Sequence, residues 1–249
     1  MPPHFIRYWL TPPPADDAFV AAVADVNGRY RAAPRLTAAG ERIRRGDELT
    51  GVHALERRHP GLPRAPGKVE RRECEYVRHG TRTCIISRDV ATGQIVAPAV
   101  GPTRTETDFV APVRAVVASD PTATRWHFVV DNLNTHQSAS LVRFVAAQSG
   151  VTDDLGAKGK AGILASQPRR AAFLRDPGHT IVFHDTPKHS SWLNQVERWR
   201  SILARKLLKR GSFTSVADLQ DKVLALIADD NRTMAKPFKW TSHGKALAA

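Results

Sequence analysis

The sequence predicts an α/β fold, and three features of its residue pattern indicate this class. Apolar runs rich in β-branched and aromatic residues, at 127–130 and 180–183, are typical of strands buried on both faces of a sheet. A Thr-Gly turn at 92–93 joins two further runs with strand character, which predicts a β-hairpin. Apolar residues recur at helical spacing in 108–119 and 138–148. Strands that alternate with helices in this way indicate a sheet with helices packed on it.

The first 72 residues are expected to contribute little to this pattern. Residues 1–40 are predicted to form a linker and helical appendage, with one helix from Asp16 to Tyr30 and Pro34 following its end. Residues 41–72 contain three prolines and several arginines. We therefore expect a mostly irregular, basic segment there.

In the middle of the chain, the helix at 108–119 precedes the first apolar run, and a second helix follows it. Thr135 or Ser138 can cap this second helix, because both side chains can accept a backbone hydrogen bond. Residues 150–178 are predicted to form a looser insertion. Its glycine-rich stretch, 156–162, lacks the spacing of a phosphate-binding loop, so we expect a flexible basic loop.

The C-terminal part is predicted to contain two amphipathic helices and a basic tail. The first helix has an apolar stripe over 192–207 and ends at Gly211. Glu197 lies at the edge of this stripe, where a carboxylate can reach a cleft, although most glutamates in such positions are solvated. The second helix covers 215–230, and the tail of residues 231–249 mixes cations with aromatics as DNA-contacting surfaces often do.

A single acid at the end of the run 127–130 is the first candidate for chemistry. Asp131 would lie at the tip of a buried strand, where α/β folds bind their ligands. The plainer alternative is that Asp131 only caps the helix that follows. Two histidines after the second run, His184 and His189, either contact a phosphate or have a structural role. The residue pattern alone leaves both questions open.

The balance of charges favours a polyanionic partner. The 249 residues include 37 Lys and Arg against 24 Asp and Glu, which gives a formal net charge of +13. Nucleic acid is the first such partner and an anionic membrane surface the second. No apolar run approaches the length of a membrane-spanning helix. The 2 cysteines form neither a disulfide framework nor a metal quartet, so we expect a reducing compartment and a cytoplasmic, nucleoid-associated protein without membrane contact.

Four longer strings of residues resemble a known family. They occupy 47–60, 101–106, 130–136 and 186–197, and they are DELTGVHALERRHP, GPTRTE, VDNLNTH and TPKHSSWLNQVE. On these strings the chain, from residue 4 to residue 246, closely resembles the transposases of bacterial insertion-sequence family 630, which are relatives of the mariner superfamily. The resemblance implies a ribonuclease-H-like fold, in which helices flank a mixed five-stranded sheet. The catalytic domain would span residues 41–230.

The resemblance also implies an acidic triad that holds two divalent metal ions. Carried over by position, the triad is Asp47, Asp131 and Glu197, and the ions would be Mg²⁺ or Mn²⁺. Carboxylates are ligands that Mg²⁺ prefers, and two metals can activate a water and stabilise the leaving oxygen when DNA is cut. The absence of a Cys and His cluster argues against a zinc enzyme. The implied activity is cleavage of DNA and transfer of its strands.

The implied partners are double-stranded DNA, from the transposon ends and the target, and a second transposase chain in a homodimer or an assembly with a full-length transposase. Basic side chains near the triad and in the tail are the expected contacts to DNA phosphates. They are Lys188, His189, Arg198, Arg205, Lys206, Lys209, Arg210, Arg232, Lys236 and Lys239.

Three features depart from the family pattern. We expect the chain to be the catalytic part of such a transposase, without the N-terminal helix-turn-helix region that recognises element ends. The strand before Asp47 contains Arg44 and Arg45 where the family has apolar residues, and two more arginines flank Trp199. If that strand is central and covered on both faces, unpaired arginines weaken the site, and Arg45 can pair with Asp47. The alternative functions are therefore an impaired, truncated remnant that binds only DNA or a full-length transposase, and a general nuclease of the same fold.

Overall fold

Five strands form one mixed sheet in the order β3-β2-β1-β4-β5. A computed structural model describes residues 17–187, 190, 193, 196–237 and 240, except for the side chains of Glu197 and Arg198. The strands are β1 (Glu41–Arg57), β2 (Tyr76–Asp89), β3 (Ile95–Gly101), β4 (Arg125–Val130) and β5 (Ile181–Asp185). The first three pair antiparallel, whereas β4 pairs parallel with β1 and β5 pairs parallel with β4. The predicted five-stranded mixed sheet is confirmed, and β1 is its central strand.

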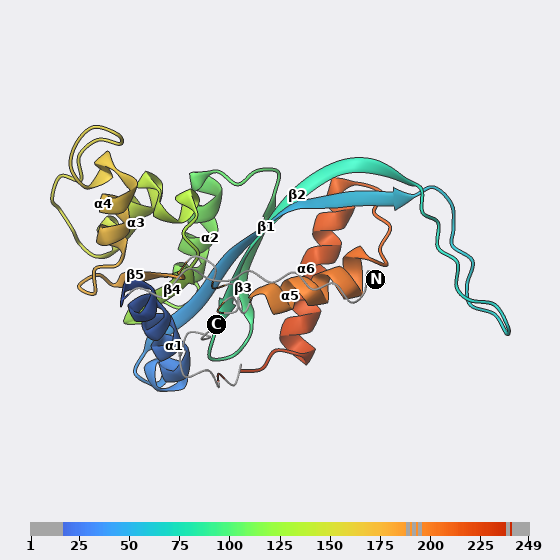
Figure 1. Cartoon of the computed structure of the whole chain (residues 1–249), viewed down its shortest axis with the longest axis horizontal. Coiled ribbons are helices and arrows are strands. Elements are labelled where there is room, and N and C mark those ends of the chain that lie inside the picture. The colour runs from blue at the N-terminus through green and yellow to red at the C-terminus, as the bar shows by residue number, and fades with distance from the viewer. Residues whose placement is uncertain (1–16, 188–189, 191–192, 194–195, 238–239, 241–249) are drawn as a thin grey trace.

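Helices cover both faces of the sheet (Figure 1). On one face lie α2 (Glu106–Ala118), α3 (Ala139–Gln148) and α4 (Gln167–Leu174), which share a core with Trp126, Phe128 and Val130. On the other face lie α1 (Asp17–Ala38), α5 (Val196–Leu203) and α6 (Val216–Thr233). Short 3-10 helices occur at Asn134–Gln137 and Ile163–Ala165, and a π-helical segment, Ala204–Leu208, continues α5. Because side chains alternate along a strand, Phe128 of β4 packs in the first core and Val129 in the second.

Several predicted helix ends are confirmed, but α1 is longer than predicted. Ser138 caps α3 and Ser215 caps α6, each by accepting a backbone N–H. Helix α1 does not end before Pro34 but continues through it to Ala38. Proline removes one helical hydrogen bond and usually ends a helix. Here Tyr30 and Ala33 are buried against the sheet, and this packing supports the helix on both sides of the proline.

The basic segment at 41–72 is less irregular than predicted, because its first 17 residues form β1. β1 and β2 pair from Arg44 with Asp89 to Arg57 with Tyr76. Their distal halves pack on α6 through Val52 and Ala54, and the segment 58–75 between them projects beyond the helices; together these parts form an arm (Figure 1). Charged residues interrupt the apolar pattern of β1, and the pairing with β2 and β4 decides its conformation instead.

The insertion at 150–178 is also more ordered than predicted. It contains α4, which Ser166 caps and whose Ala171 and Leu174 are buried. In the glycine-rich stretch Lys158 Nζ lies 3.0 Å from Glu106 Oε1, and this ion pair connects the insertion to α2.

None of the described helices is long and apolar enough to span a membrane.

The strand before Asp47 carries a buried arginine with a partner. Arg44 Nη1 donates to Asp89 Oδ2 at 2.5 Å, and its guanidinium lies 5.1 Å from the ring centroid of Trp126. Asp89 Oδ1 also accepts from the backbone N–H of Ala91 and Thr92 in the β2–β3 turn. The expectation of an unpaired charge at Arg44 is therefore wrong.

A chain of hydrogen-bonded polar side chains joins α1, β1, β4 and β5. His127 Nε2 lies 2.7 Å from Glu41 Oε2, and His127 Nδ1 lies 3.0 Å from His184 Nε2. His184 Nδ1 in turn lies 2.5 Å from Asp25 Oδ2. Burial lowers the pKa of His127 to about 4, although the hydrogen bond to Glu41 opposes this shift. His184 is buried in this chain, so of its two sequence-based interpretations the structure supports the structural one.

We expect the protein to lose stability as the pH falls from 6.5 towards 4. In this range the unfolded chain binds a proton at His127, whereas the folded chain keeps the ring neutral, so the loss is on the order of 3 kcal/mol. Urea unfolding at several pH values should show a shallower pH dependence for His127→Gln. His59→Gln, at an exposed position, should retain the parent slope. Equal slopes in the parent and His127→Gln would contradict the assignment.

Candidate active site

Two of the predicted acids lie at neighbouring positions on adjacent parallel strands. Arg45 of β1 pairs with Val129 of β4, and Asp47 and Asp131 each follow by two residues. Asp131 is the first residue after β4, as the sequence predicted. Neighbouring strands lie about 4.8 Å apart, so this register places the backbones of the two acids side by side where the β1–β4 pairing ends.

Asp47 is buried and is held by a cation from α5. Its Oδ1 accepts from the backbone N–H of Glu48 at 2.7 Å and lies 2.9 Å from Arg200 Nη2. The same Arg200 nitrogen donates to the backbone oxygen of Glu48. The sequence-based hypothesis gave the pairing with Asp47 to Arg45, but the structure shows Arg200 in this role. Arg200 was noticed only as an arginine beside Trp199, because no sequence pattern places α5 against β1.

Tyr30 and Arg45 lie on the α1 side of Asp47. Arg45 is only 1% exposed. Burial raises the pKa of Tyr30 to about 12, and the charges of Arg45 and Asp47 act on it in opposite directions. The charge of Arg45 also contributes to lowering the pKa of Asp131, after the larger contribution of a hydrogen bond from His136. Arg45 therefore lies within electrostatic reach of Asp131 and favours the ionised form of that carboxylate.

Asp131 is held by the loop that follows β4. His136 Nδ1 lies 2.8 Å from Asp131 Oδ1, and the backbone N–H of Leu133 donates to the same oxygen at 3.2 Å. On the other side of the ring, His136 Nε2 lies 3.6 Å from Glu48 Oε1. Burial alone would lower the pKa of His136, but the two carboxylates outweigh it and raise the pKa to about 9. His136 therefore lies between two carboxylates, which favour the protonated form of its ring.

The third predicted acid, Glu197, lies in the first turn of α5, and its side chain is outside the described part of the structure. Because Arg200 reaches Asp47 and the backbone of Glu48, α5 lies beside Asp47. Among the side chains that are described, no three His, Cys, Asp or Glu residues gather as a metal site. The donors present, Asp47 and Asp131, are nevertheless the hard oxygen ligands that suit Mg²⁺.

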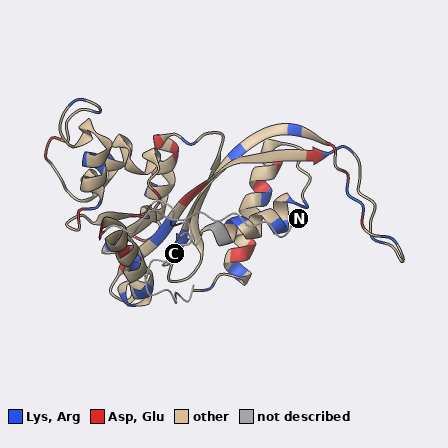
Figure 2. Ribbon diagram, in the orientation of Figure 1, with Lys and Arg blue, Asp and Glu red and all other residues tan. Residues whose placement is uncertain are grey.

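The predicted DNA contacts fall into separate groups (Figure 2). Four exposed cations lie in the π-helical segment and just after it: Arg205, Lys206, Lys209 and Arg210. Arg57 of the arm donates to the backbone oxygen of Lys209, which connects this group to the arm. Arg232 and Lys236 are exposed at the other end of α6, near the β2–β3 turn that Asn231 contacts. Outside the described part are Lys188, His189, Lys239 and the side chain of Arg198.

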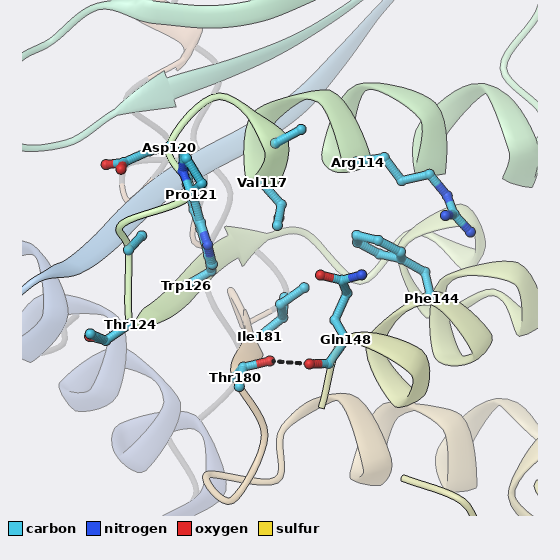
Figure 3. A pocket seen from close by; sticks show the side chains of 12 residues that line it. Arg114, Val117, Asp120, Pro121, Thr124, Trp126, Phe144, Gln148, Thr180 and Ile181 are labelled. Carbon is cyan, nitrogen blue, oxygen red and sulfur yellow. Dashed lines mark hydrogen bonds between the residues drawn. The ribbon is translucent and has the colours of Figure 1, made fainter. Parts of the chain in front are cut away.

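A pocket of about 490 Å³ lies away from the aspartates (Figure 3). Trp126 and Ile181 line it, and these residues begin β4 and β5. Arg114 and Gln148, from α2 and α3, also face it. Asp131 follows the opposite end of β4, so this pocket is not part of the candidate active site.

Sequence reasoning missed two residues of the site, Glu48 and His136. Both lie inside the strings at 47–60 and 130–136 that carry the family resemblance. Their roles depend on contacts between β1 and the loop after β4, and neither residue has a local pattern that predicts such a contact.

Comparisons with known proteins identify the family and the fold. Residues 42–220 match the family described as DDE superfamily endonuclease. The Mos1 transposase paired-end complex with left transposon end has a TM-score of 0.51 at 12% identity, over 94% of this chain and 60% of the Mos1 chain. The Mos1 strand transfer complex has a TM-score of 0.52 at 11% identity, over 90% of this chain and 57% of that one. No curated protein matches the sequence.

These likenesses show the fold, and they confirm the ribonuclease-H-like arrangement that the resemblance implied. The chain spans about 60% of the length of the Mos1 chains. The family match covers well over half of the present chain and includes Asp47 and Asp131. The protein therefore belongs to the DDE superfamily of endonucleases.

Proposed function

We propose that the protein is the catalytic part of a DNA transposase that cleaves DNA and transfers its strands with the help of divalent metal ions. The observation that carries the proposal is the position of Asp47 and Asp131 on adjacent parallel strands in a DDE fold, with α5 beside Asp47. The Mos1 structures that share the fold are complexes with a transposon end and with Mn. The motif strings support the finer assignment to bacterial insertion-sequence family 630.

Asp47, Asp131 and Glu197 would hold the metal ions, which we propose to be two Mg²⁺ or Mn²⁺. Bound there, two such ions make the attacking water more acidic and stabilise the charge on the leaving oxygen. The charge of Arg45 favours the ionised form of Asp131. Arg200 holds Asp47 Oδ1 and places a cation beside this carboxylate, where it is available to a DNA phosphate.

The activity test is a DNA-nicking assay with Mg²⁺ or Mn²⁺ that compares the parent with Glu197→Gln. Loss of nicking in the variant supports the enzyme, whereas a parent that binds DNA without nicking it supports an impaired remnant. Comparison of element ends with arbitrary duplex distinguishes a transposase from a general nuclease.

The proposed partners are transposon-end DNA, target DNA and a second transposase chain. The proposed location is the cytoplasm, in association with the nucleoid.

We expect salt-sensitive and weakly selective DNA binding through the cations beside the arm. Lys206→Ala/Arg210→Ala should weaken binding to element ends and to scrambled duplex alike, because phosphate contacts carry no sequence information. Each lost phosphate contact lowers the slope of log K against log salt by about 0.9. Fluorescence anisotropy between about 50 and 200 mM salt measures this slope.

A matched control for this prediction is Arg143→Ala/Lys160→Ala, which removes two exposed cations from α3 and the insertion. This pair should retain the parent slope. Equal slopes for the parent and Lys206→Ala/Arg210→Ala, or a large preference of the parent for element ends, would contradict the assignment.

A further inference from the structure

We propose that Glu48 and His136 form a bracket that positions the carboxylate of Asp131 for its ligand. His136 is then a positioning residue of the active site, and Glu48 is the group that fixes His136. The inference rests on the proposed function, because the ligand in question is the divalent metal.

The first step concerns how Asp131 is oriented. Its side chain is 48% exposed, so packing alone does not fix its rotamer. Among the described residues, both of its hydrogen-bond donors approach Oδ1: the His136 ring at 2.8 Å and the backbone N–H of Leu133 at 3.2 Å. This arrangement leaves Oδ2 for a ligand and defines its direction. Without the ring, the longer hydrogen bond from the backbone N–H of Leu133 is the remaining described restraint.

The second step concerns the ring of His136, which is itself held on three sides. Its side chain is fully buried, and its centroid lies 4.2 Å from that of Phe109. Nδ1 lies 3.0 Å from the backbone oxygen of Asp131, in addition to the carboxylate. Nε2 faces Glu48 Oε1 at 3.6 Å, which is an ion-pair distance but too long for a good hydrogen bond. A small movement of either group would close this gap.

The third step concerns Glu48, a carboxylate in an unusual place. Its side chain is 2% exposed. Oε1 accepts from Thr135 Oγ1 at 3.2 Å, but Oε2 is buried without a hydrogen-bond partner in the described part of the structure. A buried carboxylate that lacks partners is destabilising unless a positive charge compensates it. The ring of His136 lies at ion-pair distance from Oε1, and this contact holds the two buried side chains against each other.

Together these contacts connect both aspartates to one point of β1. Asp47 and Glu48 are successive residues, so their side chains lie on opposite faces of the sheet. Asp47 contributes its own carboxylate to the site, while Glu48 reaches Asp131 through His136 on the other face. The bracket thereby fixes the second acid relative to the first across the β1–β4 pair.

The test measures Mn²⁺ affinity by titration calorimetry and thermal unfolding without metal, for His136→Ala, His136→Asn and Glu48→Gln. Loss of a group that orients a metal ligand typically weakens metal binding by about 10- to 100-fold, and we expect this for His136→Ala. His136→Asn should recover most of the affinity, because its amide can donate to Asp131 Oδ1. Glu48→Gln should weaken binding several-fold, since it replaces the carboxylate that lies against Nε2 of the ring.

A matched control is His179→Ala. His179 is also a buried histidine packed on a phenylalanine, with its ring centroid 4.3 Å from that of Phe173. This control should lower the unfolding temperature without changing the Mn²⁺ affinity. A purely structural role of His136 would give the same result as His179→Ala.

Folded His136→Ala with the parent's Mn²⁺ affinity would overturn the bracket, and so would His136→Asn that binds as weakly as His136→Ala. If His136→Ala does not fold, Glu48→Gln decides, and an unchanged affinity there overturns the proposal. Asp131→Asn distinguishes a failure of the proposed metal function from a failure of the bracket. If the parent binds Mn²⁺ no better than Asp131→Asn, the proposed metal function is wrong. If Mn²⁺ binding needs Asp131 but not His136, only the bracket is wrong.

Discussion

Asp131→Asn is expected to reduce metal-dependent DNA cleavage on the order of 10³-fold or more, because each metal contributes several kcal/mol to the transition state. Asparagine has nearly the same shape as aspartate but lacks its charge. Asp131 is half exposed at the end of β4, so the substitution should not disturb the core. The measurement is single-turnover nicking of labelled element-end duplex with Mg²⁺ and with Mn²⁺.

Two controls make this result specific. Asp153→Asn, at an exposed position in the insertion, removes the same charge and should cleave like the parent. Glu197→Gln should lose as much activity as Asp131→Asn if α5 supplies the third acid. Cleavage by Asp131→Asn within about tenfold of the parent would remove this residue from the proposed metal site, since tenfold corresponds to only about 1.4 kcal/mol.

The elements that the sequence predicted well are those with a strong local signal. The run before Asp131 is continuously apolar and ends in an acid, so both β4 and the position of Asp131 at its tip were predictable. Ser138 and Ser215 precede helical patterns and cap them, as their side-chain chemistry favours. Local propensity and tertiary packing agree at these places.

The elements that the sequence missed depend on contacts between distant segments. β1 contains charged residues that only become compatible with a central strand once Asp89 of β2 and the ring of Trp126 lie beside Arg44. Helix α1 continues through Pro34 because Tyr30 and Ala33, which precede the proline, are buried against the sheet. Arg200 reaches Asp47 from a helix more than 150 residues away along the chain. Periodicity reports local conformation and carries no information on such partners.

The charge distribution around the aspartates follows from these distant contacts. Arg45 comes from β1 itself and Arg200 from α5, and both act on the acids at the end of the parallel strands. A cation beside a carboxylate favours its ionised form, which is the form that binds a metal. A sequence that looks too basic for a metal site is therefore compatible with one.

Arg44→Val is expected to destabilise the fold by about 3–5 kcal/mol, which is the usual result when one partner of a buried ion pair is removed. The sequence alone predicts the opposite outcome, a more stable protein, because an unpaired buried arginine would destabilise an apolar strand. The structure reverses this prediction, since Arg44→Val would leave Asp89 without its partner and with only 11% of its side chain exposed. Unfolding free energies from urea titration measure the effect.

The partially exposed pair on the same strand provides the control. Arg42 Nε lies 2.7 Å from Asp120 Oδ2, with 18% and 22% of the two side chains exposed. Arg42→Ala should therefore cost about 1 kcal/mol or less. Adding Asp89→Asn to Arg44→Val should recover much of the loss, because asparagine keeps the oxygen that accepts from Ala91 and Thr92 but leaves no buried charge. A stable Arg44→Val that Asp89→Asn does not improve would show that Arg44 contributes nothing to the strand that carries Asp47.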